Sequence, residues 1–206
     1  MFYSKLKDLV NDKSKSEYTI EELLEYFGDS TIKIGLLVST IITSLPLPPM
    51  AAGTESIPGG LLCIFFSLQG ILGMKHIYLP QSLKEIKVDI SLLFNNEYLE
   101  SIMEFIDKYF VPKRQEWVFN RMTELLMYCL VILHAILMII PIVFTTMLPS
   151  QMITAMAICW LLGDGYFVIV SMILALVMFL LYVIVGVRFT KWMYRNRKYW
   201  TFGYWK

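Results

Sequence analysis

The chain has 206 residues, 57% of them hydrophobic, and a mean hydropathy of +0.59. Soluble domains are about 45–50% apolar, so this composition excludes an ordinary soluble fold. The 18 Lys and Arg residues and 17 Asp and Glu residues give a net charge of +1, so the overall charge does not favour nucleic acid as a partner.

The positions of the cations divide the chain. They fall in three blocks, five up to Lys33, seven from Lys75 to Arg121 and six from Arg188 onward. Two long cation-free apolar tracts lie between these blocks, which predicts an all-α integral membrane protein. The predicted segments are a cytoplasmic amphipathic N-terminal segment (1–31), a first membrane half (32–79), an amphipathic cytoplasmic connector (80–121), a second membrane half (122–187) and a basic aromatic tail (188–206).

The N-terminal segment contains a predicted amphipathic helix. Thr19 and Glu22 have the spacing of a capping box, and Gly28 follows the last periodic residue, where helices commonly end. We expect this helix to lie on the membrane surface or against the cytoplasmic face of the protein. The first thirty or so residues are polar, so we expect no cleaved signal peptide.

The first apolar tract is broken near its middle. Prolines end one helix, a small-residue loop follows that holds Glu55, and a second helix starts at Pro58; the interrupting prolines are Pro46, Pro48 and Pro49. Neither apolar piece has the ~20 residues that span hydrocarbon comfortably. The break therefore lies either at membrane depth, covered by protein or a wet cavity as in transporters, or in a turn outside the bilayer.

The connector is polar with apolar residues at helical spacing, for example Leu83, Ile86 and Ile90. This spacing predicts amphipathic helices that lie on the membrane surface or cap the two halves.

The second apolar tract is longer and has three pieces. A predicted helix over 125–140 is kinked or ended by Pro141, and a short apolar piece over 151–162 follows Pro149. A predicted turn at Gly163-Asp164-Gly165 then leads into 166–187, an uncharged run of 22 apolar residues that is long enough to cross a membrane.

The tail combines cations with aromatic residues and carries no acid. This pattern favours anchoring to membrane lipids on the cytoplasmic side. The cation bias then places the N-terminus, the connector and the tail all in the cytoplasm. One piece of the second half, most simply 149–163, would have to re-enter without crossing.

The two halves resemble each other. Pro46 and Pro141, Pro58 and Pro149, and Gly70 and Gly163 are separated by 95, 91 and 93 residues. Each half also holds an acid within its apolar tract, Glu55 in the first and Asp164 in the second. We therefore predict two proline-broken helical halves that form an internal repeat.

These motifs resemble the ExoD family of bacterial inner-membrane proteins. The resemblance rests on Leu45-Pro46-Leu47-Pro48, Ile57-Pro58, Ser67-Leu68-Gln69, Leu79-Pro80 and Gly163-Asp164-Gly165, and it covers most of residues 18–187. It implies a multi-pass protein of the inner membrane, a connection to exopolysaccharide synthesis and sensitivity to alkaline stress.

The ionisable residues inside the apolar tracts are the candidate site, because a charge there is costly and by default functional. We predict that Glu55, Gln69 and Asp164 bind substrate or a coupling ion. The helix breaks expected to line the site are Pro46, Pro48, Pro58, Pro149, Gly163 and Gly165. Unpaired N–H groups at the helix starts suit an anionic group such as a lipid phosphate.

The predicted function is transport of an anionic lipid-linked or small solute. The alternative is a non-transporting accessory or scaffold subunit of a polysaccharide synthesis or export complex, and a homo-oligomer stays open. No motif indicates a metal, another cofactor or an enzyme, although a membrane hydrolase that uses Glu55 stays open. His134, alone on its helix, is expected to be hydrogen-bonded inside the bundle.

Overall fold

A computed structural model describes most of the chain. The residues described are 5, 8, 17–44, 56–74, 76–79, 81–85, 87–89, 101, 104–106, 108–110, 114–139 and 147–200.

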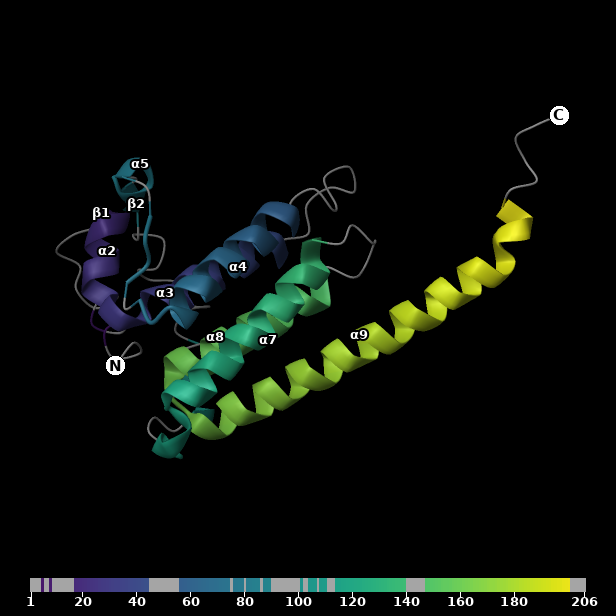
Figure 1. Cartoon of the computed structure of the whole chain (residues 1–206). Helices are drawn as coiled ribbons and strands as arrows, with labels where there is room; N and C mark the ends of the chain where they lie inside the picture. Colours follow the sequence, from purple (N-terminus) through teal and green to yellow (C-terminus); the bar gives the residue numbers. More distant parts are fainter. Residues whose placement is uncertain are drawn as a thin grey trace.

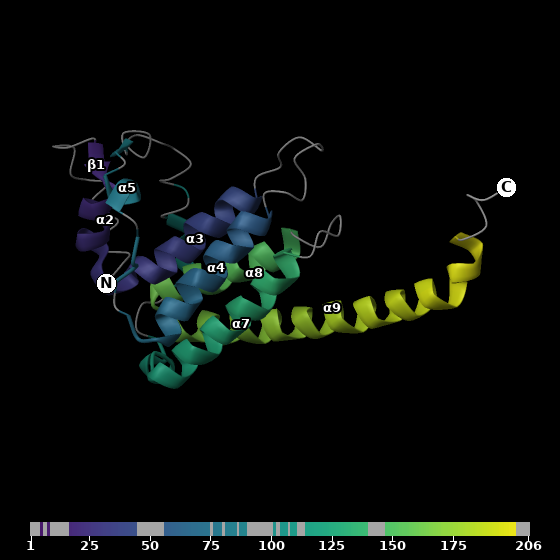
Figure 2. The same cartoon turned by 45° about the horizontal axis from the view of Figure 1, so that its top comes forward.

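Four helices form a bundle at the centre of the molecule (Figure 1). They are α3 (Thr31–Ser44), α4 (Ser56–Ile71), α7 (Arg121–Ile139) and α8 (Met147–Leu162). The helices α3 and α4 make one antiparallel hairpin, and α7 and α8 make a second. The hairpins pack so that α4 lies along α7 and α3 lies along α8 (Figure 2).

The bundle has two chemically different ends. At one end α3 and α7 begin and α4 and α8 finish; here Lys33 of α3 reaches Glu124 of α7, and Arg121 reaches the last residue of α4, Ile71. We call this the charged end. At the other, the far end, α3 and α7 finish and α4 and α8 begin.

Small residues bring the helices close together. A Cβ built on Gly60 of α4 would lie 2.8 Å from Ile139 and 3.0 Å from the backbone oxygen of Ala135, both on α7. A Cβ on Gly59 would overlap the Thr43 side chain of α3. Close backbone approach of this kind is typical of membrane helices, which lack a hydrophobic driving force between them and associate by dense packing.

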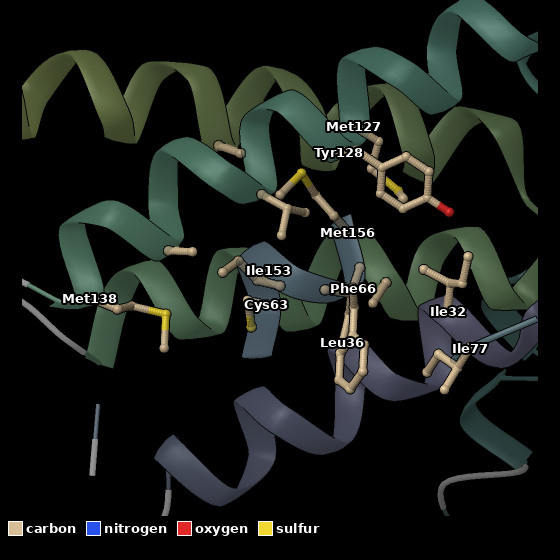
Figure 3. Packing of buried hydrophobic residues seen from close by; sticks show 14 residues of the cluster. Ile32, Leu36, Cys63, Phe66, Ile77, Met127, Tyr128, Met138, Ile153 and Met156 are labelled. Atoms are coloured by element: carbon tan, nitrogen blue, oxygen red, sulfur yellow. The ribbon is translucent and has the colours of Figure 1, made fainter. Parts of the chain in front are cut away.

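Buried apolar side chains from all four helices meet inside the bundle (Figure 3). The cluster consists of Ile32, Leu36, Cys63, Phe66, Ile77, Met127, Tyr128, Val131, Ala135, Met138, Ile153, Met156, Ala157 and Ala175. It contains no Lys, Arg, Asp or Glu; Lys33, Arg121 and Glu124 lie at the charged end.

The helix α9 (Gly165–Trp200) runs from the charged end past the far end (Figure 1). Its 36 residues make it about 54 Å long at about 1.5 Å per residue. Ala175 is buried against the bundle, whereas the described side chains from Val183 to Arg195 are exposed. By length and composition, two described helices could cross a membrane, Arg121–Ile139 and Gly165–Asn196.

This path bears on the predicted topology. The helices α7, α8 and α9 alternate in direction, so the tail leaves the bundle at the far end, while the N-terminal elements lie at the charged end (Figures 1 and 2). The number of membrane crossings and the side on which the N-terminus lies stay predictions.

The N-terminal segment forms the predicted helix, α2 (Ile20–Phe27), with the expected ends. The Thr19 hydroxyl accepts from the Glu22 N–H, the Glu22 carboxylate accepts from the Thr19 N–H, and Gly28 ends the helix with a φ of 54°. A 3-10 turn over Gly28–Ser30 then leads into α3. Leu24 packs against the bundle core, so α2 lies against the protein.

Sequence spacing misjudged part of the connector. Helical spacing from Leu83 to Ile90 predicted an amphipathic helix, but the helix α5 covers only Gln81–Lys84. Lys87–Asp89 instead forms the strand β2, which pairs antiparallel with β1 (Glu17–Thr19). A second 3-10 turn, η3 (Glu116–Val118), precedes α7.

Candidate functional site

A partly buried ion pair crosses the charged end of the bundle. Lys33, in the first turn of α3, is 8% exposed, and its Nζ lies 2.5 Å from Oε1 of Glu124, in the first turn of α7. The pair therefore joins the first hairpin to the second. Burying two charges is costly, and a well-packed apolar pair is often as stable, so packing alone does not require an ion pair here.

Two aromatic rings flank the Lys33 ammonium. Nζ lies 5.8 Å from the centre of the Tyr128 ring on α7 and 5.7 Å from that of the Trp160 ring on α8. Cations within about 6 Å of a ring face are attracted by its quadrupole. Gly70 of α4 makes room for this arrangement, because a Cβ there would overlap the Tyr128 ring.

Glu124 has further partners on its own helix. Arg121 Nη1 donates to Glu124 Oε2 at 3.1 Å, and the Tyr128 hydroxyl donates to Oε1 at 3.3 Å. Arg121 Nη2 also donates to the backbone oxygen of Ile71 at 2.6 Å. That contact satisfies a carbonyl at the end of α4 and places a cation where the helix dipole favours one.

Gln69, a predicted site residue, is 5% exposed and holds the chain that follows α4. The Tyr78 N–H donates to Gln69 Oε1 at 2.7 Å, and Gln69 Nε2 donates to the Tyr78 oxygen at 3.4 Å. The Ile77 N–H donates to Oγ1 of Thr31 at 3.2 Å. The Gln69 amide thereby holds Tyr78, and the Thr31 hydroxyl holds Ile77, over the charged end. A role of Gln69 in binding substrate stays a prediction.

Asp164, the second predicted residue, is fully buried. Arg114 Nε donates to its Oδ1 at 3.1 Å, and the Tyr166 N–H donates to the same oxygen at 3.0 Å. Asp164 thus caps α9 and pairs with a cation that precedes α7. Contacts of this kind can be structural, so binding of a solute by Asp164 stays a prediction.

The glycines beside Asp164 form the predicted turn. Gly163 has a φ of 75°, which L side chains rarely adopt. A Cβ on Gly165 would lie 2.6 Å from the backbone oxygen of Gln115. Both glycines therefore let the chain reverse sharply between α8 and α9, close to the segment before α7.

Two of the predicted helix breaks lie in first turns. Pro58 is exposed in the first turn of α4, and Pro149 is buried in the first turn of α8. Proline suits this position because the N–H that it lacks would have no partner within the helix. The other predicted residues, Pro46, Pro48 and Glu55, lie outside the described residues.

The predicted site residues do not all gather in one place. Gln69 and Asp164 both lie at the charged end, where Gln69 binds the Tyr78 backbone and Asp164 pairs with Arg114. Ser56, which directly follows Glu55, begins α4 at the far end. Thirteen residues of helix, about 20 Å, separate Ser56 from Gln69.

Sequence reasoning missed the Lys33–Glu124 pair. Lys33 was counted only as the last cation before the first apolar tract, and its partner lies 91 residues away. The available signal was local: Glu124 and Tyr128 are one helical turn apart, at the start of an apolar helix.

Other buried polar groups lie within the bundle. His134 is fully buried, and its Nδ1 lies 2.9 Å from the Leu130 oxygen, so the predicted hydrogen bond inside the bundle is confirmed. Thr154 of α8 donates to Thr40 of α3 at 2.7 Å and links the two hairpins. Within the described residues, no group of three or more His, Cys, Asp or Glu could hold a metal ion.

Comparison with known proteins gives one family. A family model described as "Exopolysaccharide synthesis, ExoD" matches residues 2–184. Searches of curated proteins and of solved structures found no match.

Proposed function

Since the chain belongs to the ExoD family, membrane-associated proteins with a role in exopolysaccharide synthesis, we propose that it serves this role as a carrier for an anionic lipid-linked or small solute. The carrier would move the solute between its two helical hairpins. The Lys33–Glu124 pair, which joins the hairpins across the charged end, is the observation that carries this proposal.

The arrangement of the hairpins supports a repeated carrier unit. If α3 corresponds to α7 and α4 corresponds to α8, the contact between α3 and α8 is equivalent to the contact between α7 and α4. Both contacts are extensive. Both hairpins also start from the charged end. Parallel repeats in transporters are related by an axis along the membrane normal, and one repeat rocks against the other.

The contacts between the hairpins differ along the bundle. At the charged end the Lys33–Glu124 ion pair and the Arg121–Ile71 hydrogen bond join them, and nearer the far end the Thr40 and Thr154 hydroxyls do so. Rocking would therefore have to break a strong polar contact at one end, which makes the ion pair a gate.

The test reconstitutes the full chain in vesicles of phosphatidylethanolamine and phosphatidylglycerol with a trace of headgroup-labelled phosphatidylglycerol. In protein-free vesicles, dithionite added outside bleaches only the label in the outer leaflet. We expect wild-type protein to expose inner-leaflet label as well. No movement of the label by wild-type protein would contradict the carrier and favour the accessory-subunit alternative.

A cross-link tests whether the hairpins must move. The Thr40 and Thr154 hydroxyls are 2.7 Å apart, so a Thr40→Cys/Thr154→Cys variant is placed to form a disulfide between α3 and α8. Its background replaces the native thiols, Cys63, Cys129 and Cys159, with alanine. We expect oxidation to stop lipid movement and reduction to restore it, whereas neither single-cysteine variant should respond. Equal movement in both redox states would contradict rocking.

A further inference from the structure

We infer that the Lys33 ammonium binds the phosphate headgroup of an anionic amphiphile, and that Glu124 is the counter-ion it holds when no such ligand is present. This inference rests on the proposed carrier function and names the chemistry of its ligand. It depends on two observations: the Lys33 ammonium has donors to spare, and Glu124 has hydrogen-bond partners besides Lys33.

Lys33 has spare capacity for an anion. An ammonium has three N–H donors, and among the described residues Glu124 is the carboxylate within ion-pair distance of this one. The faces of the Tyr128 and Trp160 rings also lie beside the ammonium. Lysine is a common phosphate ligand that acts as a point charge, so a phosphate oxygen can take the place of the Glu124 oxygen.

Glu124 keeps hydrogen-bond partners when Lys33 binds a phosphate in its place. Arg121 holds Oε2 at 3.1 Å, and the Tyr128 hydroxyl reaches Oε1 at 3.3 Å. Removing one member of a buried ion pair is usually costly because the other is left uncompensated. Here the transfer of Lys33 to a phosphate leaves neither charge without a partner, so the two arrangements can exchange.

The surroundings favour a phosphate that carries an apolar chain. Trp160, beside the ammonium, is partly exposed, so the aromatic wall of the site reaches the surface of the bundle. Large apolar side chains are exposed on the bundle exterior, including Val38 of α3, Leu61 and Phe65 of α4, and Leu126 of α7. An alkyl chain can contact apolar side chains of this kind while its headgroup reaches Lys33, a contact that free phosphate cannot make.

Binding can be measured on the full chain in an uncharged detergent, with dodecyl phosphate as the probe. The readouts are tryptophan fluorescence, to which Trp160 contributes from beside Lys33, and thermal unfolding, because a bound ligand raises the melting temperature. Dodecanol supplies the chain without the charge, and inorganic phosphate supplies the charge without the chain. We expect a saturable response to dodecyl phosphate alone, and an equal response to inorganic phosphate would overturn the amphiphile as the ligand.

Substitutions of Lys33 and Glu124 are expected to change the affinity for dodecyl phosphate in opposite directions. Lys33→Gln should weaken dodecyl phosphate binding about tenfold or more, as expected for loss of a hydrogen bond from a charged donor. Lys33→Arg should retain binding, and Lys191→Gln, at an exposed lysine of α9, should leave it unchanged. Glu124→Gln should tighten binding, because it removes the competing negative charge while the amide keeps a hydrogen-bonding oxygen.

Tightening by Glu124→Gln separates this inference from a purely structural pair, which would give weaker binding or none in either variant. Unchanged binding in Lys33→Gln, or weaker binding in Glu124→Gln, would overturn it. The measurement does not involve transport. Protein that binds dodecyl phosphate through Lys33 without moving labelled lipid would support this site and contradict the carrier.

Discussion

Tyr128 links the core of the bundle to its charged end, and its position depends on the absence of a side chain at Gly70. The phenol is 1% exposed, its ring packs where a Cβ on Gly70 would lie, and its hydroxyl reaches Glu124. Gly70→Ala should therefore push the ring away and lower the free energy of unfolding by about 1–3 kcal/mol, the usual cost of overpacking. Thermal unfolding in detergent measures this loss.

The matched control for Gly70→Ala is Gly186→Ala in α9. A Cβ at residue 186 meets nothing within 4 Å, so alanine there should be neutral or should stabilise the helix by up to about 1 kcal/mol. Combining Gly70→Ala with Tyr128→Leu should recover part of the loss, because the smaller side chain makes room. Equal melting temperatures for the two single variants would show that Tyr128 does not need the glycine.

The sequence predicts which polar residues lie inside the apolar tracts, but it does not predict which groups they contact. Gln69 and Asp164 stood out as polar groups in apolar tracts, and both are buried. Their partners, the Tyr78 backbone and Arg114, depend on how a long connector folds back. Apolar periodicity carries no information about such contacts. Lys33 and Glu124 were overlooked for a related reason, since each lies at the edge of its tract, where a charge looks like ordinary solvation.

At the scale of helices, the two hairpins are joined by few polar contacts. The Thr154 hydroxyl donates to Thr40 and lies close to the Ser150 oxygen of its own helix. Hydrogen bonds between membrane helices contribute about 0.6 kcal/mol on average, so Thr154→Val should destabilise the bundle by roughly that amount. The change preserves shape and removes the donor, and chemical unfolding in detergent measures the difference.

Thr190→Val in α9 is the control for the interhelical bond. Its hydroxyl donates at 2.8 Å to Gly186 on the same helix, in an exposed setting. Losing that bond should change stability little, because it links no second helix. A loss for Thr190→Val as large as that for Thr154→Val would mean that the effect comes from helix propensity and not from the contact between hairpins.

The ends of several helices were predictable from prolines and glycines in the sequence. Pro58, Pro149 and the turn at Gly163 marked ends that the structure places within a few residues. The strands β1 and β2 had no such signal, because each has three residues and becomes stable only by pairing with a segment far away in the chain. The spacing of Leu83 and Ile86 therefore predicts a helix where part of the segment, Lys87–Asp89, forms a strand.

At the scale of the whole molecule, the cation pattern conflicts with the path of the helices. The positive-inside rule draws the N-terminal segment, the connector and the tail to one side of the membrane. The structure instead places the N-terminal elements at the charged end and starts α9 there, so the tail leaves at the far end (Figure 1). If α9 crosses the bilayer, one block of cations must lie outside.

The relative sizes of the cation blocks indicate which block lies outside. The N-terminal and connector blocks hold twelve of the 18 Lys and Arg residues, and the tail holds six. The first helices usually set the orientation of a membrane protein, so we predict a cytoplasmic charged end and a tail on the opposite side. In this prediction the segment 149–163 crosses the membrane instead of re-entering, so that all three pieces of the second half cross.

Single cysteines can test that topology in a background that replaces the native thiols with alanine. His76→Cys reports the charged end and Arg195→Cys reports α9 beyond the far end; both positions are exposed. On intact cells, a membrane-impermeant maleimide should label Arg195→Cys alone, and after permeabilisation it should label both. Leu174→Cys, exposed midway along the apolar part of α9, should stay unlabelled throughout because a thiol in hydrocarbon does not ionise.

Absence of label at residue 195 until permeabilisation would return the tail to the cytoplasm. The helix α9 would then have to leave the bundle without crossing, and its apolar run would lie along the membrane surface, a costly position for a helix that is apolar on every side.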